Sequence, residues 1–119
     1  MKTIEKLEQV KEQKANLKEW SINYTFYWAY RSALETGNEL IDLNDVVWEN
    51  DVKPIIEHCK EFGIKQITIS SNFSGAIQML GLFEDNGCKV MGLKKVKSQY
   101  TDFYSQEYRI INAVIIQMP

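Results

Sequence analysis

The stretch at residues 68–75, Thr-Ile-Ser-Ser-Asn-Phe-Ser-Gly, carries the residue types best suited to chemistry. We predict that it joins a strand to a helix, where free backbone N–H groups can hold a phosphate. A serine beside a base could also act as a nucleophile. The turn lacks the glycine-rich patterns G-x-x-x-x-G-K-[ST] and G-x-G-x-x-G, and Ser71 and Asn72 are ordinary capping residues. Three interpretations of Ser70–Gly75 stay open: a helix cap, a ligand site and a nucleophilic serine.

The one histidine, His58, stands beside Cys59 on a predicted helix. Neighbouring helical residues point about 100° apart, so this pair can form neither a catalytic dyad nor a shared metal site. Cys88 would still leave a zinc site one ligand short. We therefore expect no metal, no cofactor and no enzymatic activity. Two cysteines are too few for a disulfide scaffold, so both are expected to be reduced thiols.

Acidic residues cluster within a nearly neutral chain of 14 basic and 16 acidic residues, whose formal net charge is −2. Six acidic side chains occur between residues 35 and 51, where no lysine or arginine interrupts them. Such acids are common in connectors and at helix starts, where the helix dipole favours them. They could equally form an acidic surface that attracts a basic partner. The predicted partner-binding acids are Glu35, Glu39, Asp42, Asp45, Glu49 and Asp51.

Basic and aromatic residues follow one another near the end of the chain. The basic residues are Lys89, Lys94, Lys95 and Lys97. Lysines on an edge strand discourage unwanted strand pairing, whereas lysines beside exposed rings could contact single-stranded nucleic acid. The net charge is too neutral for general nucleic-acid binding by charge alone. The aromatic residues of the next segment, Tyr100, Phe103 and Tyr104, favour a protein interface.

Length predicts a single domain over residues 1–119, with a helical segment at about residues 2–36. A first helix is expected at residues 2–19 and a second at about 17–36, which could continue the first. The second helix has aromatic residues on two faces, so it is either buried twice or meets a partner. If the first helix extends the second, the stripe of Ile22, Phe26 and Tyr30 favours a homodimer.

The remaining pattern predicts an α+β fold. Helices are expected at Glu49–Phe62 and about Phe73–Asn86, the latter capped by Ser71 or Asn72. Strands are expected at residues 64–70, 88–97 and 107–118, with a connector at 38–44 and a loop at 98–106. The last strand is apolar on both faces and therefore central, whereas the other two are edges. The expected architecture is a split β-α-β unit: a three-stranded mixed sheet with the C-terminal strand central and the N-terminal helices packed on it.

Localisation is expected to be cytoplasmic and away from membranes. The charged N-terminus lacks the apolar core of a signal peptide, and no run approaches the length of a membrane span.

Three stretches resemble a known family: ELIDLNDVVWENDVKPI (39–55), GIKQITISSNFSG (63–75) and YTDF (100–103). Its members are small proteins of unassigned function from phages, plasmids and conjugative elements of low-GC Gram-positive bacteria. The resemblance covers roughly Gly37 to the C-terminus and brings no catalytic residues. It implies a gene beside factors that blunt host defence, including anti-restriction and anti-CRISPR proteins.

We therefore expect a non-enzymatic protein that inhibits or regulates a host defence nucleoprotein. The leading partner is a basic nucleic-acid-handling protein such as a CRISPR-Cas effector, which would make the chain an anti-CRISPR protein. The alternatives are a small ligand-binding or enzymatic domain using Ser70–Gly75, and a nucleic-acid binder using the strand Lys89–Lys97.

Overall fold

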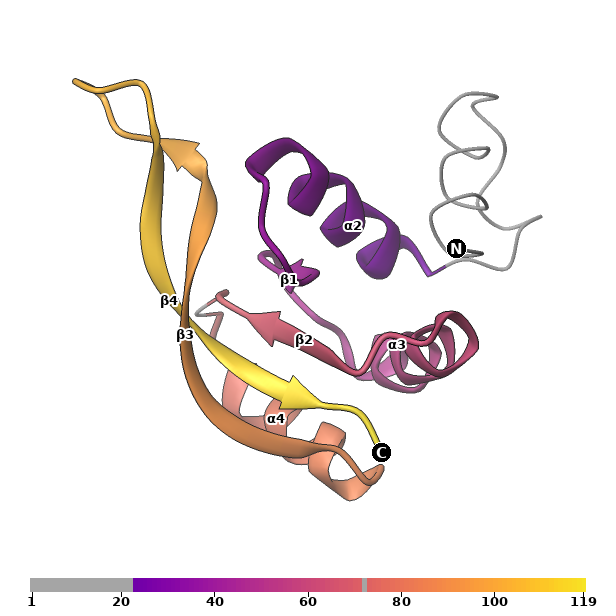
Figure 1. The fold of residues 1–119 in the computed structure, drawn as a ribbon. Coiled ribbons are helices and arrows are strands. Elements are labelled where there is room, and N and C mark those ends of the chain that lie inside the picture. Colours follow the sequence, from indigo (N-terminus) through magenta and orange to yellow (C-terminus); the bar gives the residue numbers. More distant parts are fainter. Residues whose placement is uncertain (1–22, 72) are drawn as a thin grey trace.

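Three helices and four strands alternate in the part of the chain that the computed structural model describes, residues 23–71 and 73–119 (Figure 1). The expected first helix, at residues 2–19, lies outside these residues. The elements are α2 (Tyr24–Thr36), β1 (Asp42–Leu43), α3 (Glu49–Phe62), β2 (Gln66–Ile69), α4 (Ala76–Asp85), β3 (Lys89–Thr101) and β4 (Tyr108–Gln117). The domain is of the α+β class and contains a mixed sheet.

Local capping sets where the first two described helices begin and end. Helix α2 starts at Tyr24 rather than near residue 17, because Asn23 is extended and its side chain accepts a hydrogen bond from the Phe26 N–H. It ends at Gly37, which adopts the left-handed conformation with φ 77°. Helix α3 has the predicted bounds, and the Asp51 carboxylate accepts the Trp48 N–H at its start.

In the described part of the chain the sheet has four strands in the order β1-β2-β4-β3, not the three that the sequence predicts. Strand β4 is antiparallel to both of its neighbours, β2 and β3, and β1 is parallel to β2. The expectation of a plain connector at residues 38–44 is therefore wrong. The prediction that residues 64–70 form an edge strand is also wrong, because β1 pairs with β2. A strand of two residues is too short to show a period of two.

Helices cover the sheet from more than one side: α2 lies beside the upper part of β3 and β4, and α4 lies behind them (Figure 1). The core contains fully buried side chains from all three described helices and from strands of the sheet, such as Phe26, Ile55, Phe83 and Ile116. Burying a side chain of this size contributes roughly 1.5–3 kcal/mol. These contacts hold the helices on the sheet.

Helix α2 buries one of its aromatic faces and exposes the other. Phe26 and Tyr30 are buried, whereas Tyr24 and Trp28 are exposed. The stripe expected to meet a second chain therefore packs in this chain's own core, and Ile22 lies outside the described residues. The part of the stripe that the structure describes is therefore covered within this chain, and the homodimer stays a prediction.

Strands β3 and β4 form a long hairpin whose end projects past the helices (Figure 1). Strand β3 runs to Thr101 rather than ending at Lys97, so the predicted loop at 98–106 shrinks to a turn. Strand β4 is well covered only in its second half, where Ala113 and Ile116 are buried, while Ile110 near the projecting end is 59% exposed. The inference that this strand is an inner one agrees with its place between β2 and β3, but its apolar residues near the projecting end are left exposed.

Candidate functional site

The turn at the end of the hairpin is built by hydrogen bonds around Asp102. Its backbone N–H donates to the Glu107 carbonyl at 2.7 Å, and its carbonyl accepts the Gln106 N–H at 3.0 Å. One carboxylate oxygen, Oδ1, accepts the N–H groups of Tyr104 at 2.8 Å and Ser105 at 3.2 Å. The bonds from Tyr104 and then Ser105 lower the Asp102 pKa, because they favour the charged carboxylate. The turn is thus locally fixed rather than an irregular loop.

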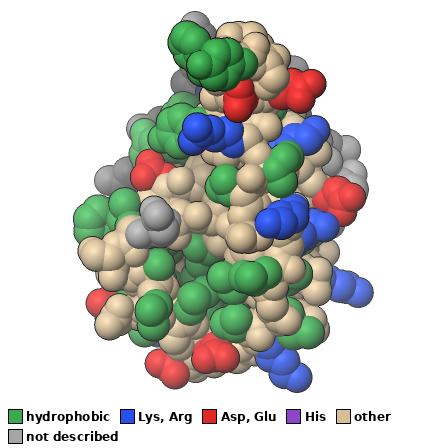
Figure 2. Space-filling view, turned by 90° about the vertical axis from the view of Figure 1, so that its left-hand side faces the viewer, with side chains coloured by type: hydrophobic (Ala, Val, Ile, Leu, Met, Phe, Trp, Pro, Cys, Tyr) green, Lys and Arg blue, Asp and Glu red, His purple; other side chains and the backbone are tan. Residues whose placement is uncertain are grey.

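Two aromatic rings stand on this turn with almost no cover from the rest of the chain. Phe103 is 82% exposed and Tyr104 is 92% exposed, and their rings meet edge to face with centroids 5.3 Å apart. Tyr100, on the adjoining end of β3, is 68% exposed. Figure 2 shows hydrophobic side chains at the top of the molecule, where the tip lies, with acidic side chains beside them. All three aromatic residues predicted from the sequence are therefore available to a partner.

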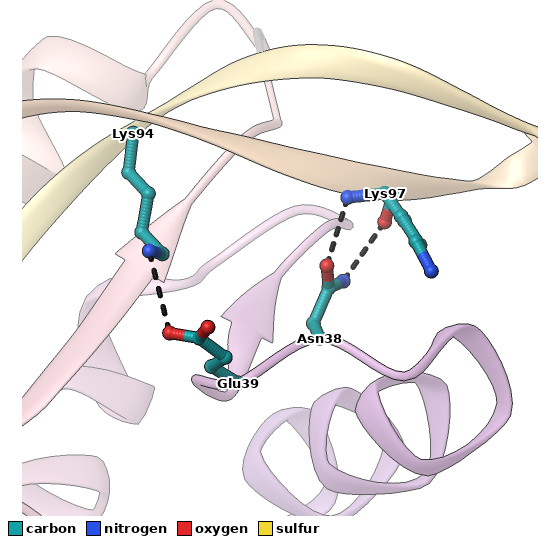
Figure 3. Close-up of polar contacts among 4 residues, drawn as sticks. All are labelled: Asn38, Glu39, Lys94 and Lys97. Atoms are coloured by element: carbon teal, nitrogen blue, oxygen red, sulfur yellow. Dashed lines mark hydrogen bonds and ion pairs between the residues drawn. The ribbon is translucent and has the colours of Figure 1, made fainter.

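The hairpin stem is fixed to the body by Asn38, which directly follows helix α2 and Gly37 (Figure 3). The Asn38 side chain donates to the Lys97 carbonyl at 2.9 Å and accepts the Lys97 N–H at 2.8 Å. It thereby pairs with the open edge of β3 as a neighbouring strand would. Beside it, Glu39 forms an ion pair with Lys94 at 3.5 Å. Sequence reasoning missed Asn38, since one asparagine after a helix carries no distinctive signal.

The four predicted lysines do not form one basic stripe. Lys95 and Lys97 alternate along β3, so they share a face of the hairpin, and both are exposed. Lys94 occupies an alternate position on the strand, and its side chain reaches Glu39 (Figure 3). Lys89 is at the far end of the strand, opposite Gln117. Only Lys95 and Lys97 lie together near the aromatic tip.

The six predicted acids likewise do not form one surface, because two of them are structural. Asp42 is buried on β1, where it accepts hydrogen bonds from the hydroxyls of Thr68 and Ser70. Burial raises its pKa, and these two hydrogen bonds oppose the shift. Asp51 accepts the Asn23 side-chain N–H and the Thr25 hydroxyl, each at 2.8 Å. Asp42 therefore has no surface to offer a partner.

The other four acids remain at the surface. Glu39 is engaged with Lys94 but is still 83% exposed in its side chain. Glu35, Asp45 and Glu49 are exposed. Glu35 lies on α2, Glu39 between α2 and β1, Asp45 in the loop after β1, and Glu49 at the first position of α3. Their charges are therefore spread over the body of the domain.

The serine turn is committed to the sheet. The N–H groups of Ser70 and Ser71 both donate to the Leu43 carbonyl, and the Ser70 hydroxyl donates to Asp42. Helix α4 begins at Ala76 with Gly75 as its N-cap, so the predicted cap at Ser71 or Asn72 is wrong. The turn's first two N–H groups are already used, and they cannot cradle a phosphate without breaking the β1–β2 junction.

The histidine and the cysteines are buried. His58 accepts the Asn23 N–H at 3.0 Å, and its ring lies between those of Phe26 and Phe62. Cys59 and Cys88 are free, and burial, together with the neighbouring Cys88, raises the Cys59 pKa to about 12. A thiol with so high a pKa is a weak nucleophile. Among the described residues, His, Cys, Asp and Glu form no group of three that could hold a metal ion.

Within residues 23–71 and 73–119, no helix has the length and apolar character needed to span a membrane.

Comparison with known proteins places the chain in a family. The family model described as "Domain of unknown function (DUF7698)" matches residues 25–118. No curated protein and no solved structure matches the chain. The match extends from the first turn of α2 to the end of β4, so it includes the hairpin with its aromatic tip. The chain therefore belongs to the family of the domain of unknown function DUF7698.

Proposed function

We propose that this domain is a non-enzymatic protein-binding module that docks on its partner through the tip of the β3–β4 hairpin. One observation carries the proposal: Phe103 and Tyr104, adjacent on a fixed turn, are 82% and 92% exposed. Interface anchors are enriched in large aromatic side chains that become buried on binding. Rings in this position contribute little to the domain's own core, so their burial energy is available to a complex.

The hydrogen bonds that order the turn support tight binding of a partner without a catalytic step. Asp102 holds the backbone of Tyr104 and Ser105, and Asn38 holds the stem at Lys97. A surface that is already ordered loses less conformational entropy on binding than a mobile loop does. Such a module would act by occupying a surface that its partner needs for activity.

The proposed partner is a host defence nucleoprotein, with a CRISPR-Cas effector in the cytoplasm as the leading choice. The resemblance to mobile-element proteins supports this choice. The exposed acids on the body, such as Asp45 and Glu49, would complement a basic nucleic-acid-binding groove. A second candidate partner is single-stranded nucleic acid, favoured by Lys95 and Lys97 on the stem near the exposed rings.

The test compares a tip variant with a matched surface variant. Phe103→Ala/Tyr104→Ala removes both exposed rings, whereas Ile77→Ala removes a side chain that is 79% exposed on α4. Affinity for a purified Cas effector loaded with guide RNA is measured, together with inhibition of target cleavage. The tip variant should lose about 30-fold or more in affinity, since one hot-spot truncation costs about 2 kcal/mol or more. The Ile77 variant should match wild type.

Three results would overturn parts of the proposal. Equal affinity of wild type and the tip variant would remove the tip as the binding site. Loss of affinity only in Ile77→Ala would move the site to the exposed face of α4. Tight, salt-sensitive binding of a single-stranded oligonucleotide, lost in Lys95→Ala/Lys97→Ala, would favour the nucleic-acid candidate instead.

A further inference from the structure

A cavity of about 360 Å³ lies between the start of helix α2, the loop after β1 and the residue preceding α3. It is at the opposite end of α2 from Asn38, which fixes the hairpin stem. Pockets for small ligands usually have volumes of about 300–1,000 Å³. The cavity is thus large enough for a side-chain-sized group and is separate from the hairpin tip.

Three exposed aromatic rings from two parts of the chain line this cavity. Tyr24 and Trp28 are one helical turn apart on α2, and Trp48 precedes α3. They are 65%, 51% and 68% exposed, respectively. A set of partly exposed rings around one hollow is not explained by packing of the core.

A hydrogen-bond network fixes the position of these rings. The Asp51 carboxylate accepts the Thr25 hydroxyl at 2.8 Å and the Trp48 N–H at 2.9 Å. Asp51 also accepts the Asn23 side-chain N–H, at the cap of α2. The partly buried Asp51 carboxylate therefore links the start of α2 to the start of α3. This link sets Tyr24 and Trp28 against Trp48 before any ligand arrives.

The electrostatics of the cavity favour a cation. The Asp45 carboxylate lines it, and among the described residues no lysine or arginine lines it, although Arg31 lies against the Trp28 ring. The Val46 N–H holds Asp45 Oδ1 at 2.7 Å, which orients the carboxylate. Aromatic faces attract ammonium and guanidinium groups, and aromatic cages recognise alkylammonium ligands. This chain already makes such a contact, because the Arg31 guanidinium carbon lies 5.0 Å from the Trp28 ring centroid.

We propose that this cavity binds the ammonium group of a lysine side chain from a partner protein. The three rings would surround the side chain, and Asp45 would pair with its charge. Lysine fits better than arginine, since Asp45 Oδ1 already accepts the Val46 N–H, whereas a planar guanidinium is bound best by both oxygens of a carboxylate. The inference rests on the proposed function only in taking the ligand from a protein, and it does not require the hairpin tip.

The test uses small probes, so it does not depend on knowing the partner. N-acetyl-lysine methylamide and its neutral Nε-acetylated form are titrated into the ¹⁵N-labelled chain, and the indole N–H signals of Trp28 and Trp48 are followed by NMR. The charged probe should shift both signals and bind at least about tenfold more tightly than the neutral one. Equal affinities would overturn the proposal, because an apolar pocket would then suffice. Tighter binding of tetramethylammonium would also overturn it, by assigning the cavity to free quaternary amines.

Matched variants separate this site from the hairpin. Trp48→Ala and Asp45→Asn should each weaken lysine binding by about tenfold, while Trp48→Phe keeps a ring and should retain most of it. Trp48 is 68% exposed, and its backbone bond to Asp51 survives these changes, so the variants should fold. Tyr104→Ala should bind the probe as wild type does. Unchanged probe binding in both Trp48→Ala and Asp45→Asn would refute the cavity as the lysine-binding site, even if the tip were shown to bind a partner.

Discussion

The contact between Asn38 and the edge of β3 gives the sharpest test of how the hairpin is held. Replacing Asn38 by alanine removes the bond to the Lys97 carbonyl and the bond from the Lys97 N–H. It also removes the bond of 2.9 Å that the Asn38 side-chain N–H donates to the Thr36 hydroxyl at the end of α2, while Gly37 itself is unaltered. Position 38 has ordinary backbone conformation rather than the left-handed geometry of Gly37, so alanine introduces no strain of that kind.

The expected loss follows from three hydrogen bonds, of which the two to Lys97 are exposed and the one to Thr36 is part-buried. Each bond contributes about 0.5–1.5 kcal/mol net, and water can replace the two exposed ones. Asn38→Ala should therefore lower the free energy of unfolding by about 1.5 kcal/mol, near the lower limit for three bonds. Glu39→Gln is the matched control, because it breaks the neighbouring ion pair with Lys94. The Glu39 side chain in this pair is exposed to solvent. Such pairs contribute about 0–1 kcal/mol.

Urea denaturation measures the global loss, and amide hydrogen exchange measures it at the contact. In Asn38→Ala the Lys97 N–H should exchange about fivefold faster, which corresponds to about 1 kcal/mol. In Glu39→Gln its exchange should change little. Unaltered exchange of the Lys97 amide in Asn38→Ala would refute the reasoning, because the side chain would then not protect this edge.

Three further predictions concern buried and turn-forming titratable groups. Burial raises the Asp42 pKa above its ordinary value of 3.8. In the pH range between the unfolded-state pKa and the raised folded-state pKa, the folded state therefore binds more protons than the unfolded state. The free energy of unfolding should consequently fall as pH rises through this window, and urea titrations should show a smaller fall in Asp42→Asn. The Asp102 pKa is lowered, so its contribution to the turn is present above pH 3.8 and lost on acidification; backbone NMR relaxation should show a looser tip in acid and, at pH 7, in Asp102→Ala. Burial, reinforced by Cys88, raises the Cys59 pKa to about 12, so a thiol reagent at pH 8 should label Cys59 slowly in the native chain and rapidly in urea, whereas rapid native labelling would contradict its burial.

Parts of the fold follow directly from local sequence signals. The end of α3 was predictable because Gly63 takes the left-handed conformation just past it, whereas Pro54 lies inside the helix rather than in its first turn. The inner position of β4 follows from its apolar residues, such as Ala113 and Ile116, which are buried. Both cases depend on residues whose preference is strong and local.

Other parts depend on contacts between distant segments, which periodicity cannot reveal. Strand β1 exists because Thr68 and Ser70 donate backbone bonds to Ile41 and Leu43. The same junction buries Asp42 against two hydroxyls, so an acid that looked like part of a surface is internal. No pattern within residues 35–51 signals this partner on β2.

The candidate site was predictable by residue type but not by geometry. An aromatic segment after a strand indicated Tyr100, Phe103 and Tyr104. No local pattern indicates that β3 extends to Thr101 and carries the rings to a projecting turn. The phase of α2 was likewise open, because both of its faces are aromatic; packing of Phe26 against His58 decides which face is buried.

The central claim is that the hairpin tip contacts a partner protein. A photoreactive benzoylphenylalanine is placed at position 103, or at position 77 as a separate control, in the chain expressed inside cells. Both positions are suitable because both native side chains are highly exposed. Irradiation followed by mass spectrometry should give one dominant protein crosslinked through position 103, with little product through position 77. That product should disappear when Tyr104→Ala is added. The same products from both positions, or none from position 103, would contradict the account.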